Sequence, residues 1–317
     1  MKNGNRRFIK NEVNHIYQRA IHGFNIFYSQ YDRLTFYTIF SHFARKRNIK
    51  VLGLCIMTDH IHALVQTGSR DELSEFISLY SSLFARFYNN DKGFKGKLFE
   101  KSFGSAPKIG EKKVRTAIAY LFNNPVEKLL CPKAEDFRWN FLGYATSAHP
   151  FSKKLQMSCS SSSLRKAIKI VKRKRSSDQY LNHQTLRQLF NKLDLNEQEQ
   201  LTDYIIATYS PFDYDLLIRY FGNYDKMLIA INANTGSEYE IREEYIPNSD
   251  TSYKDIADYL TERFNIGPQS IASLSDAFKS DLHHLLLSHT HATSRQICKY
   301  LRIKAAVPKS PPDKNGV

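Results

Sequence analysis

The stretch VLGLCIMTDHIHALVQ, residues 51–66, decides the fold of the first half of the chain. Val51 to Met57 is a continuous apolar run that is short enough for a buried strand, and His60 to Gln66 is a second strand-like stretch. Thr58 and Asp59 interrupt the apolar pattern between the two runs. Because a tight turn at this point would join neighbouring strands, the stretch predicts an antiparallel hairpin.

The elements around this hairpin alternate between strand and helix patterns. Apolar spacing predicts a strand at 13–20, helices at 32–47 and 71–88, and a short strand near 103–109. A third helix should run over residues 111–123 and end there, because the residue before Pro125 disfavours the α conformation. This order predicts an α+β fold in which a ferredoxin-like antiparallel sheet carries its helices on one face.

The second half of the chain has a different pattern. Ser158 to Ser163 is rich in serine and has no apolar periodicity, and a compact basic run follows at Lys172 to Arg175. We therefore interpret residues 151–176 as a basic, serine-rich linker between a first domain, residues 1–150, and a mostly α-helical C-terminal domain, residues 177–317. The basic run suits either a solvated helix end or a contact to a phosphate backbone.

Two segments of the C-terminal domain share a local pattern. Each begins with a candidate capping box, Ser252-x-x-Asp255 in one and Thr293-x-x-Gln296 in the other, followed by apolar residues at helical spacing. Short helices of this kind build helix-turn-helix units, and they also build ordinary small helical domains. The pattern by itself leaves both interpretations open.

The charge of the chain is concentrated in its first half. The 317 residues carry 46 Lys and Arg against 31 Asp and Glu, a formal net charge of +15. Residues 1–175 hold 32 basic and 12 acidic side chains, whereas residues 176–317 hold 14 and 19. Charge that served only solubility would be spread more evenly. A basic excess in one half is typical of a polyanion-binding domain, and it indicates nucleic acid as the partner.

Composition excludes several classes of protein. The 21 Phe and 19 Tyr rule out global disorder, and the absence of a long apolar run predicts no membrane span. Residues 1–7 are not followed by the apolar core of a secretory signal. The four cysteines lie far apart, without the spacing of a zinc site or a disulfide framework. These features suit a cytoplasmic protein.

His60 and His62 are candidate metal ligands. Side chains alternate faces along a strand, so both imidazoles of this pair point to one side of the expected strand. Two imidazoles on one face can share a metal ion, although most pairs with this spacing are incidental. The pair therefore needs support from elsewhere in the chain.

Tyr120 and Asn124 are candidates for the remainder of such a site. They are four residues apart, so they project from one helical face if the third helix reaches Asn124. A phenol can act as a nucleophile when a metal ion polarises the electrophile, and a carboxamide oxygen can complete the metal shell. A lone tyrosine is more often a core residue, so the residues alone predict a site that combines a metal ion with a tyrosine without proving it.

Four segments, in their order along the chain, resemble the single-tyrosine HUH transposases. Residues 54–65, LCIMTDHIHALV, are similar to the motif that names the family, and YLFNNPV at 120–126 resembles the tyrosine helix of its REP-associated branch. GKLFEKSF at 96–103 and FRWN at 137–140 resemble two further family segments, and His15 stands where many members carry a histidine. The resemblance covers roughly the first half of the chain.

Three positions depart from the family pattern. Thr58 replaces the usual proline, Phe99 replaces a common tryptophan, and Glu127 stands where a basic residue is typical. None of these changes removes a candidate catalytic side chain. Phe99 and Glu127 bear on which substrate is preferred.

The resemblance implies an HUH nuclease domain that acts as a single-strand DNA endonuclease and strand transferase. His60 and His62 would bind Mg²⁺ or Mn²⁺, with Asn124 as a candidate third ligand. Tyr120 would attack a backbone phosphate, giving a 5′-phosphotyrosine and a free 3′-hydroxyl. The family acts on single-stranded DNA that folds into imperfect hairpins, so a nucleoid-associated cytoplasmic protein is implied. Its members include monomers and homodimers, and the sequence does not choose between them.

Basic side chains interleaved with aromatic ones suit the DNA contact, because cations follow phosphates and rings stack on unpaired bases. The candidates are Arg86, Lys92, Lys95, Lys97, Lys101 and Lys108. Two alternatives to the transposase remain open. One is a domesticated regulator that binds DNA hairpins without cutting them, and the other is a nickase of rolling-circle replication or conjugation.

Overall fold

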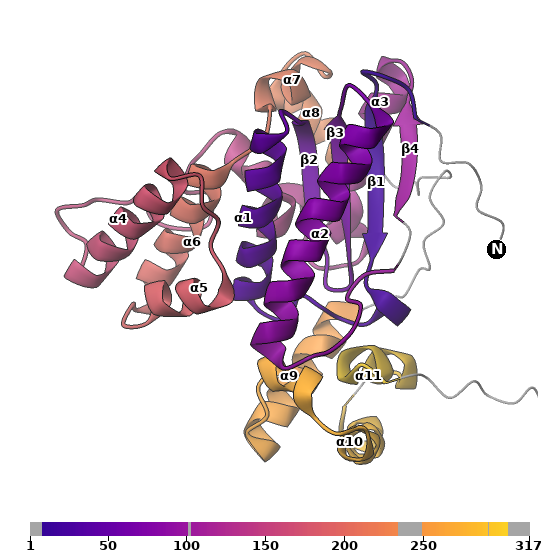
Figure 1. Cartoon of the computed structure of the whole chain (residues 1–317), viewed down its shortest axis with the longest axis vertical. Coiled ribbons are helices and arrows are strands. Elements are labelled where there is room, and N and C mark those ends of the chain that lie inside the picture. The colour runs from indigo at the N-terminus through magenta and orange to yellow at the C-terminus, as the bar shows by residue number, and fades with distance from the viewer. Residues whose placement is uncertain (1–7, 101–102, 234–248, 291, 304–317) are drawn as a thin grey trace, which may run out of the picture.

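A single four-stranded antiparallel sheet forms the centre of the first half of the chain. The structure, a computed structural model, describes residues 8–100, 103–233, 249–290 and 292–303. The strands are β1 (Val13–Arg19), β2 (Lys50–Ile56), β3 (His60–Gln66) and β4 (Gly104–Lys108), in the spatial order β2-β3-β1-β4 (Figure 1). β2 and β3 pair with Ile56 opposite Ile61, which confirms the predicted hairpin.

Three long helices cover this sheet, and they lie on both of its faces. α1 (Gln30–Lys46) and α2 (Arg70–Lys92) pack on one face against residues such as Ile61. α3 (Glu111–Glu127) packs on the other face, where Leu64 belongs to its core cluster. The α+β class is confirmed, but the prediction that the helices lie on one face was wrong for α3, which packs opposite the other two. The reason is that β2 has apolar side chains on both faces, Leu54 on one and Leu52 and Cys55 on the other, so both faces must be covered.

α3 continues past the point at which Pro125 was expected to end it. The helix runs to Glu127 and includes the proline, so Tyr120 and Asn124 lie one turn apart on the same helix. Asn124 and Pro125 are buried against the sheet, and the Lys128 amide still donates to the Asn124 carbonyl at 3.1 Å. A proline in the last turn removes only one hydrogen bond, and packing outweighs that loss here.

The segment expected to be a linker contains a helix instead. α4 (Ser162–Ser176) buries Leu164, Ala167, Ile168 and Val171 in the core cluster that also holds α1 and α2. Its apolar residues recur at helical spacing, but they alternate with so many lysines and arginines that the segment reads as polar. The basic run at 172–175 is the end of α4, with Lys172 and Arg173 exposed.

The helices that follow α4 pack against elements of the first half of the chain. They are α5 (His183–Phe190), α6 (Leu195–Tyr209), α7 (Tyr214–Arg219) and α8 (Tyr224–Asn232). α5 and α6 lie beside α1, on its side away from the sheet, and α4 packs against them (Figure 1). α7 and α8 pack with α3 and β2. The core therefore continues beyond residue 150, and the division into separately folding domains stays a prediction.

The last described helices share a small core of their own. They are α9 (Ser249–Phe264), α10 (Asp276–His289) and α11 (Ser294–Leu301), and we call them together the α9–α11 unit. Thr293 and Gln296 form the predicted capping box at the start of α11. The second predicted capping box, at Ser252 and Asp255, was wrong, because Ser252 lies inside α9 rather than at its start. The helix-turn-helix interpretation stays a prediction.

Short 3₁₀ helices join these elements: η1 (Ile21–Gly23), η2 (Ala134–Asp136), η3 (Arg138–Asn140), η4 (Leu142–Ala145) and η5 (Pro268–Ser273). Within the described ranges, each helix is too short or too polar to cross a bilayer.

Candidate functional site

β3 places His60 and His62 side by side on the face of the sheet that α3 covers. Both side chains are buried, and their ring centroids are 5.1 Å apart. The neighbouring strand β1 adds Tyr17, whose ring lies 5.4 Å from that of His60 and 5.1 Å from that of His62. His15, also on β1, pairs its Nε2 with Nδ1 of His62 at 3.0 Å. The imidazoles are thus held in one orientation by the strand next to them.

α3 brings Tyr120 and Asn124 to these imidazoles within the same chain. The Tyr120 ring lies 5.7 Å from that of His62 and 5.8 Å from that of His15. Asn124 Nδ2 donates to the Tyr120 hydroxyl at 3.5 Å, as the four-residue spacing predicts. The residues that the sequence selected at 60, 62, 120 and 124 therefore meet at one place, although they come from two elements.

The polar atoms at this place fit a divalent cation. His60 Nε2 and Asn124 Oδ1 are buried atoms without a hydrogen-bond partner in the described chain. In His62, the contact with His15 engages Nδ1, so that ring would bind an ion through Nε2. A buried acceptor without a donor is costly, and a cation would satisfy it. Two imidazoles and an amide oxygen form a neutral, incomplete shell with room for phosphate or water oxygens.

Asp59 is a residue of this site that the sequence reasoning missed. Its Oδ1 lies 2.6 Å from His60 Nδ1, and its Oδ2 lies 3.2 Å from Lys299 Nζ and 3.6 Å from a terminal nitrogen of Arg19. Burial alone would raise the pKa of Asp59, but His60 and the two cations outweigh burial and lower it. Its position directly before His60 was the available signal, since metal-binding histidines often donate their second N–H to a carboxylate.

The basic residues predicted to contact DNA divide into two groups. The side chains of Arg86, Lys95 and Lys97 are exposed, as a DNA contact requires. Lys92 and Lys108 are 4% and 1% exposed, so they are buried side chains and not surface contacts for a phosphate backbone. Lys101 lies outside the described residues. Lysine is rarely buried unless it is paired, and for that reason the predicted DNA-binding lysines were all expected at the surface.

One groove includes an exposed basic residue, Lys97, in its lining. It has a volume of about 300 Å³ and lies along α2, lined by Ser78, Ser81, Lys97 and Phe103 among others. Several aromatic residues of this region belong to the core instead, since Tyr88 and Phe99 are buried. The structure thus keeps part of the predicted basic and aromatic surface and assigns the rest to packing.

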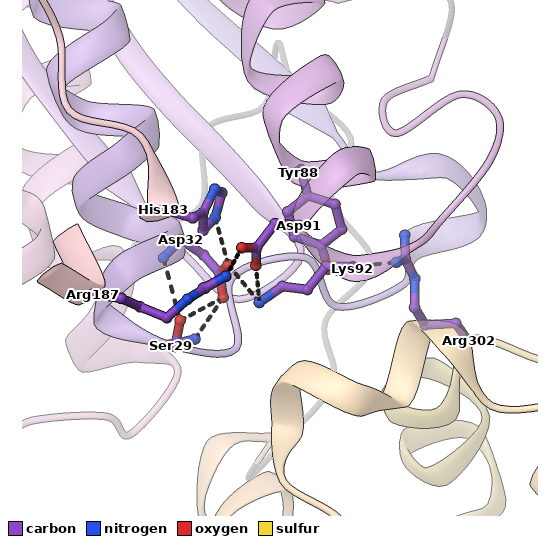
Figure 2. Close-up of polar contacts among 8 residues, drawn as sticks. All are labelled: Ser29, Asp32, Tyr88, Asp91, Lys92, His183, Arg187 and Arg302. Carbon is purple, nitrogen blue, oxygen red and sulfur yellow. Dashed lines mark hydrogen bonds and ion pairs between the residues drawn. The ribbon is translucent and has the colours of Figure 1, made fainter. Parts of the chain in front are cut away.

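A second cluster of acidic and histidine side chains, Asp32, Asp91 and His183, has the composition of a metal site. Figure 2 shows the Lys92 ammonium between its carboxylates, 3.1 Å from Asp32 Oδ1 and 3.2 Å from Asp91 Oδ2. His183 Nε2 lies 2.9 Å from the same Asp32 oxygen, and Arg187 pairs with Asp91. Protein cations already balance these carboxylates, so we assign this cluster to stabilising the fold.

A comparison with protein families matches the first part of the chain. Residues 11–124 match the model of a family described as "Transposase IS200 like", a range that runs from β1 to Asn124. The resemblance recognised in the sequence is confirmed for this segment. No curated protein matches the chain. Among solved structures, a REP-associated tyrosine transposase bound to a REP hairpin shares 17% sequence identity, with 46% of this chain and 86% of that chain covered and a TM-score of 0.39.

Proposed function

With residues 11–124 matching the IS200-like transposase family, we propose that this chain is a single-strand DNA endonuclease and strand transferase that acts on hairpin DNA. One observation carries the proposal. The phenol of Tyr120 lies beside the buried imidazole of His62 and the side-chain amide of Asn124, and the ring of His60 adjoins that of His62. His60 Nε2 and Asn124 Oδ1 have no hydrogen-bond partner in the described chain. A nucleophile next to side-chain atoms that can bind a cation suits phosphodiester cleavage.

Each residue of the proposed site would have its own role in the reaction. His60, His62 and Asn124 would hold one divalent ion, Mg²⁺ or Mn²⁺, which when bound supplies positive charge to the non-bridging phosphate oxygens. The Tyr120 hydroxyl attacks phosphorus, the bond to the 3′ oxygen breaks, and the phenolic proton passes to solvent while the 3′ oxygen takes one up. The products are a 5′-phosphotyrosine and a 3′-hydroxyl, which can reverse the reaction and so transfer the strand.

Access to the site requires movement. Tyr120 is 3% exposed and His62 and Asn124 are fully buried, so a backbone phosphate cannot reach the phenol in the arrangement described above. α3 or the segments over it must shift when DNA binds. Because Tyr120 already lies beside the imidazoles of its own chain, a single chain can supply every residue of the proposed site.

The test is covalent trapping of DNA. Purified protein is incubated with 5′- and 3′-labelled single-stranded hairpins and Mg²⁺ or Mn²⁺, and adducts are separated on a denaturing gel. We expect an adduct that carries the label of the downstream fragment, that disappears with EDTA and that is absent in Tyr120→Phe. His60→Ala should lower its yield about 100-fold.

Tyr17 offers a matched control, because its ring also contacts His60 and His62 but lies on β1. Tyr17→Phe should retain the adduct. An adduct that survives Tyr120→Phe and disappears in Tyr17→Phe would transfer the nucleophile to β1. Hairpin binding without any adduct would favour the non-cleaving regulator, and cleavage of unstructured origin sequences in preference to hairpins would favour the nickase.

A further inference from the structure

The α9–α11 unit is docked on the turn that precedes the two imidazoles. Figure 1 shows the unit against the lower ends of the sheet and of α2. The Asn25 amide donates to the Lys299 carbonyl at 3.3 Å, and the Tyr28 hydroxyl donates to the Tyr300 carbonyl at 2.6 Å. The guanidinium carbon of Arg302 lies over the ring of Tyr88 on α2, 5.4 Å from the ring centroid. The C-terminal end of α11 is therefore held by several contacts.

One side chain of α11 reaches the candidate metal site through an intermediate residue. Lys299 is 8% exposed, and its Nζ lies 3.2 Å from Asp59 Oδ2. The other oxygen of Asp59 lies 2.6 Å from Nδ1 of His60, whose Nε2 is a candidate ligand atom. A continuous line of polar contacts thus joins residue 299 to residue 60.

The chemistry of this line determines what it can do. With Oδ2 engaged by Lys299, the carboxylate of Asp59 turns Oδ1 toward the N–H at Nδ1 of His60. A proton held on Nδ1 leaves the lone pair on Nε2, which is the form of imidazole that binds a metal ion. Arg19, at 3.6 Å from the same Oδ2, is a weaker second anchor. Lys299 is accordingly the main restraint on the rotation of the carboxylate.

We propose that Lys299 is a positioning residue for the metal site, so that docking of the α9–α11 unit sets the affinity of the site for its divalent cation. The inference rests on the proposed function, because it assumes that His60 binds an ion. It extends that function by making an element about 240 residues away in sequence part of the support of the site. Loss of the contact between Lys299 and Asp59 would let the Asp59 carboxylate rotate, and the imidazole of His60 would then be held less firmly.

Lys279 provides a matched comparison. It lies on α10 of the same unit and is 5% exposed, so it is buried to a similar degree. Asp276, on its own helix, is the acidic group whose charge acts on it most strongly. Replacing Lys279 removes a buried ammonium from the unit and leaves Asp59 and His60 as they are.

The test is a titration of the full chain with Mn²⁺, in the absence of DNA, followed by electron paramagnetic resonance of the free ion. We expect Lys299→Met to weaken Mn²⁺ binding about tenfold, the effect usual for a residue that orients a ligand. Lys299→Arg should restore binding to within about threefold, and Lys279→Met should bind as the wild type does. In an Asp59→Asn background, Lys299→Met should have no further effect, because Lys299 acts through Asp59.

Each outcome separates the inference from the proposed function. If the wild type binds no Mn²⁺, or binds it equally well in His60→Ala, the proposed function fails and the inference fails with it. If His60→Ala abolishes binding while Lys299→Met binds as the wild type does, only the inference is overturned. If Lys299→Met does not fold, Lys299→Gln is measured in its place, and unchanged binding in that variant overturns the inference equally.

Discussion

Two buried carboxylates of this chain have almost the same partners and different surroundings. Asp32, at the start of α1, contacts an imidazole and an ammonium, those of His183 and Lys92. Asp59, in the hairpin turn, also contacts an imidazole and an ammonium, those of His60 and Lys299. A list of residue types would not distinguish the two clusters.

What lies around the imidazole distinguishes them. The ring of His183 has Phe84 and Tyr88 as its aromatic neighbours, at 6.5 and 6.3 Å, and a lysine already balances the carboxylates there. Each of the two rings has one buried nitrogen without a hydrogen-bond partner in the described chain, but only the ring of His60 lies beside a second imidazole, 5.1 Å away. An aspartate–histidine pair therefore supports a metal site only where further ligand atoms converge on the imidazole.

The largest effect should come from removing the charge of Asp32. Asp32→Asn leaves the buried Lys92 with Asp91 as its remaining acidic partner, so we expect the free energy of unfolding to fall by about 3 kcal/mol. Urea denaturation measures it. The control is Asp178→Asn, which weakens contacts with Arg45 and His42 at a half-exposed position and should cost less than about 1 kcal/mol. Equal losses in the two variants would contradict the assignment of Asp32.

The next effect is a dependence of stability on acid pH. Burial alone would raise the pKa of Asp32, but the hydrogen bond from His183 and the charge of Lys92 outweigh burial and lower it to about 2, from an ordinary value of 3.8. A carboxyl with a lowered pKa stabilises the folded state above its unfolded pKa and loses that contribution as the pH falls toward the folded one. The stability difference between the wild type and Asp32→Asn should shrink by about 2 kcal/mol between pH 5 and pH 2, as in urea titrations at each pH. A constant difference would mean that Asp32 has an ordinary pKa.

A smaller effect, on binding rather than folding, should appear at the other carboxylate. Asp59→Asn should weaken Mn²⁺ binding about tenfold, which is about 1.4 kcal/mol, because the amide orients His60 less strongly than a carboxylate does. The folded fraction of Asp32→Asn should bind Mn²⁺ as the wild type does. Calorimetric titration below the unfolding temperature compares them. If Asp32→Asn weakened Mn²⁺ binding and Asp59→Asn did not, the metal site would belong to the Asp32 cluster instead.

The smallest effect should come from the edge of the Asp32 cluster. Arg187 pairs with Asp91, but its side chain is 49% exposed. Exposed ion pairs contribute little because water competes with them, so Arg187→Ala should cost less than about 0.5 kcal/mol in urea denaturation. A loss close to that of Asp32→Asn would show that the stabilising charge network extends to the surface.

Local patterns were enough to predict much of the fold and of the candidate site. All four strands and the three helices of the first half lie where apolar periodicity placed them, within a few residues. The shared face of His60 and His62 follows from the alternation of a strand, and that of Tyr120 and Asn124 follows from the turn of a helix. Such predictions succeed because each depends on residues within one element.

Contacts between distant segments were not predictable in this way. The pairing of Asp59 with Lys299, the burial of Lys92 and Lys108, and the core that takes in α4 all depend on which elements pack together. A lysine reads as a surface residue until the fold places a carboxylate beside it. The sequence by itself determined the +20 balance of residues 1–175 and which side chains can share a face. Only the tertiary structure decided which carboxylates supply a cluster that stabilises the fold and which supplies the candidate metal site, because that choice depends on neighbours far away in the chain.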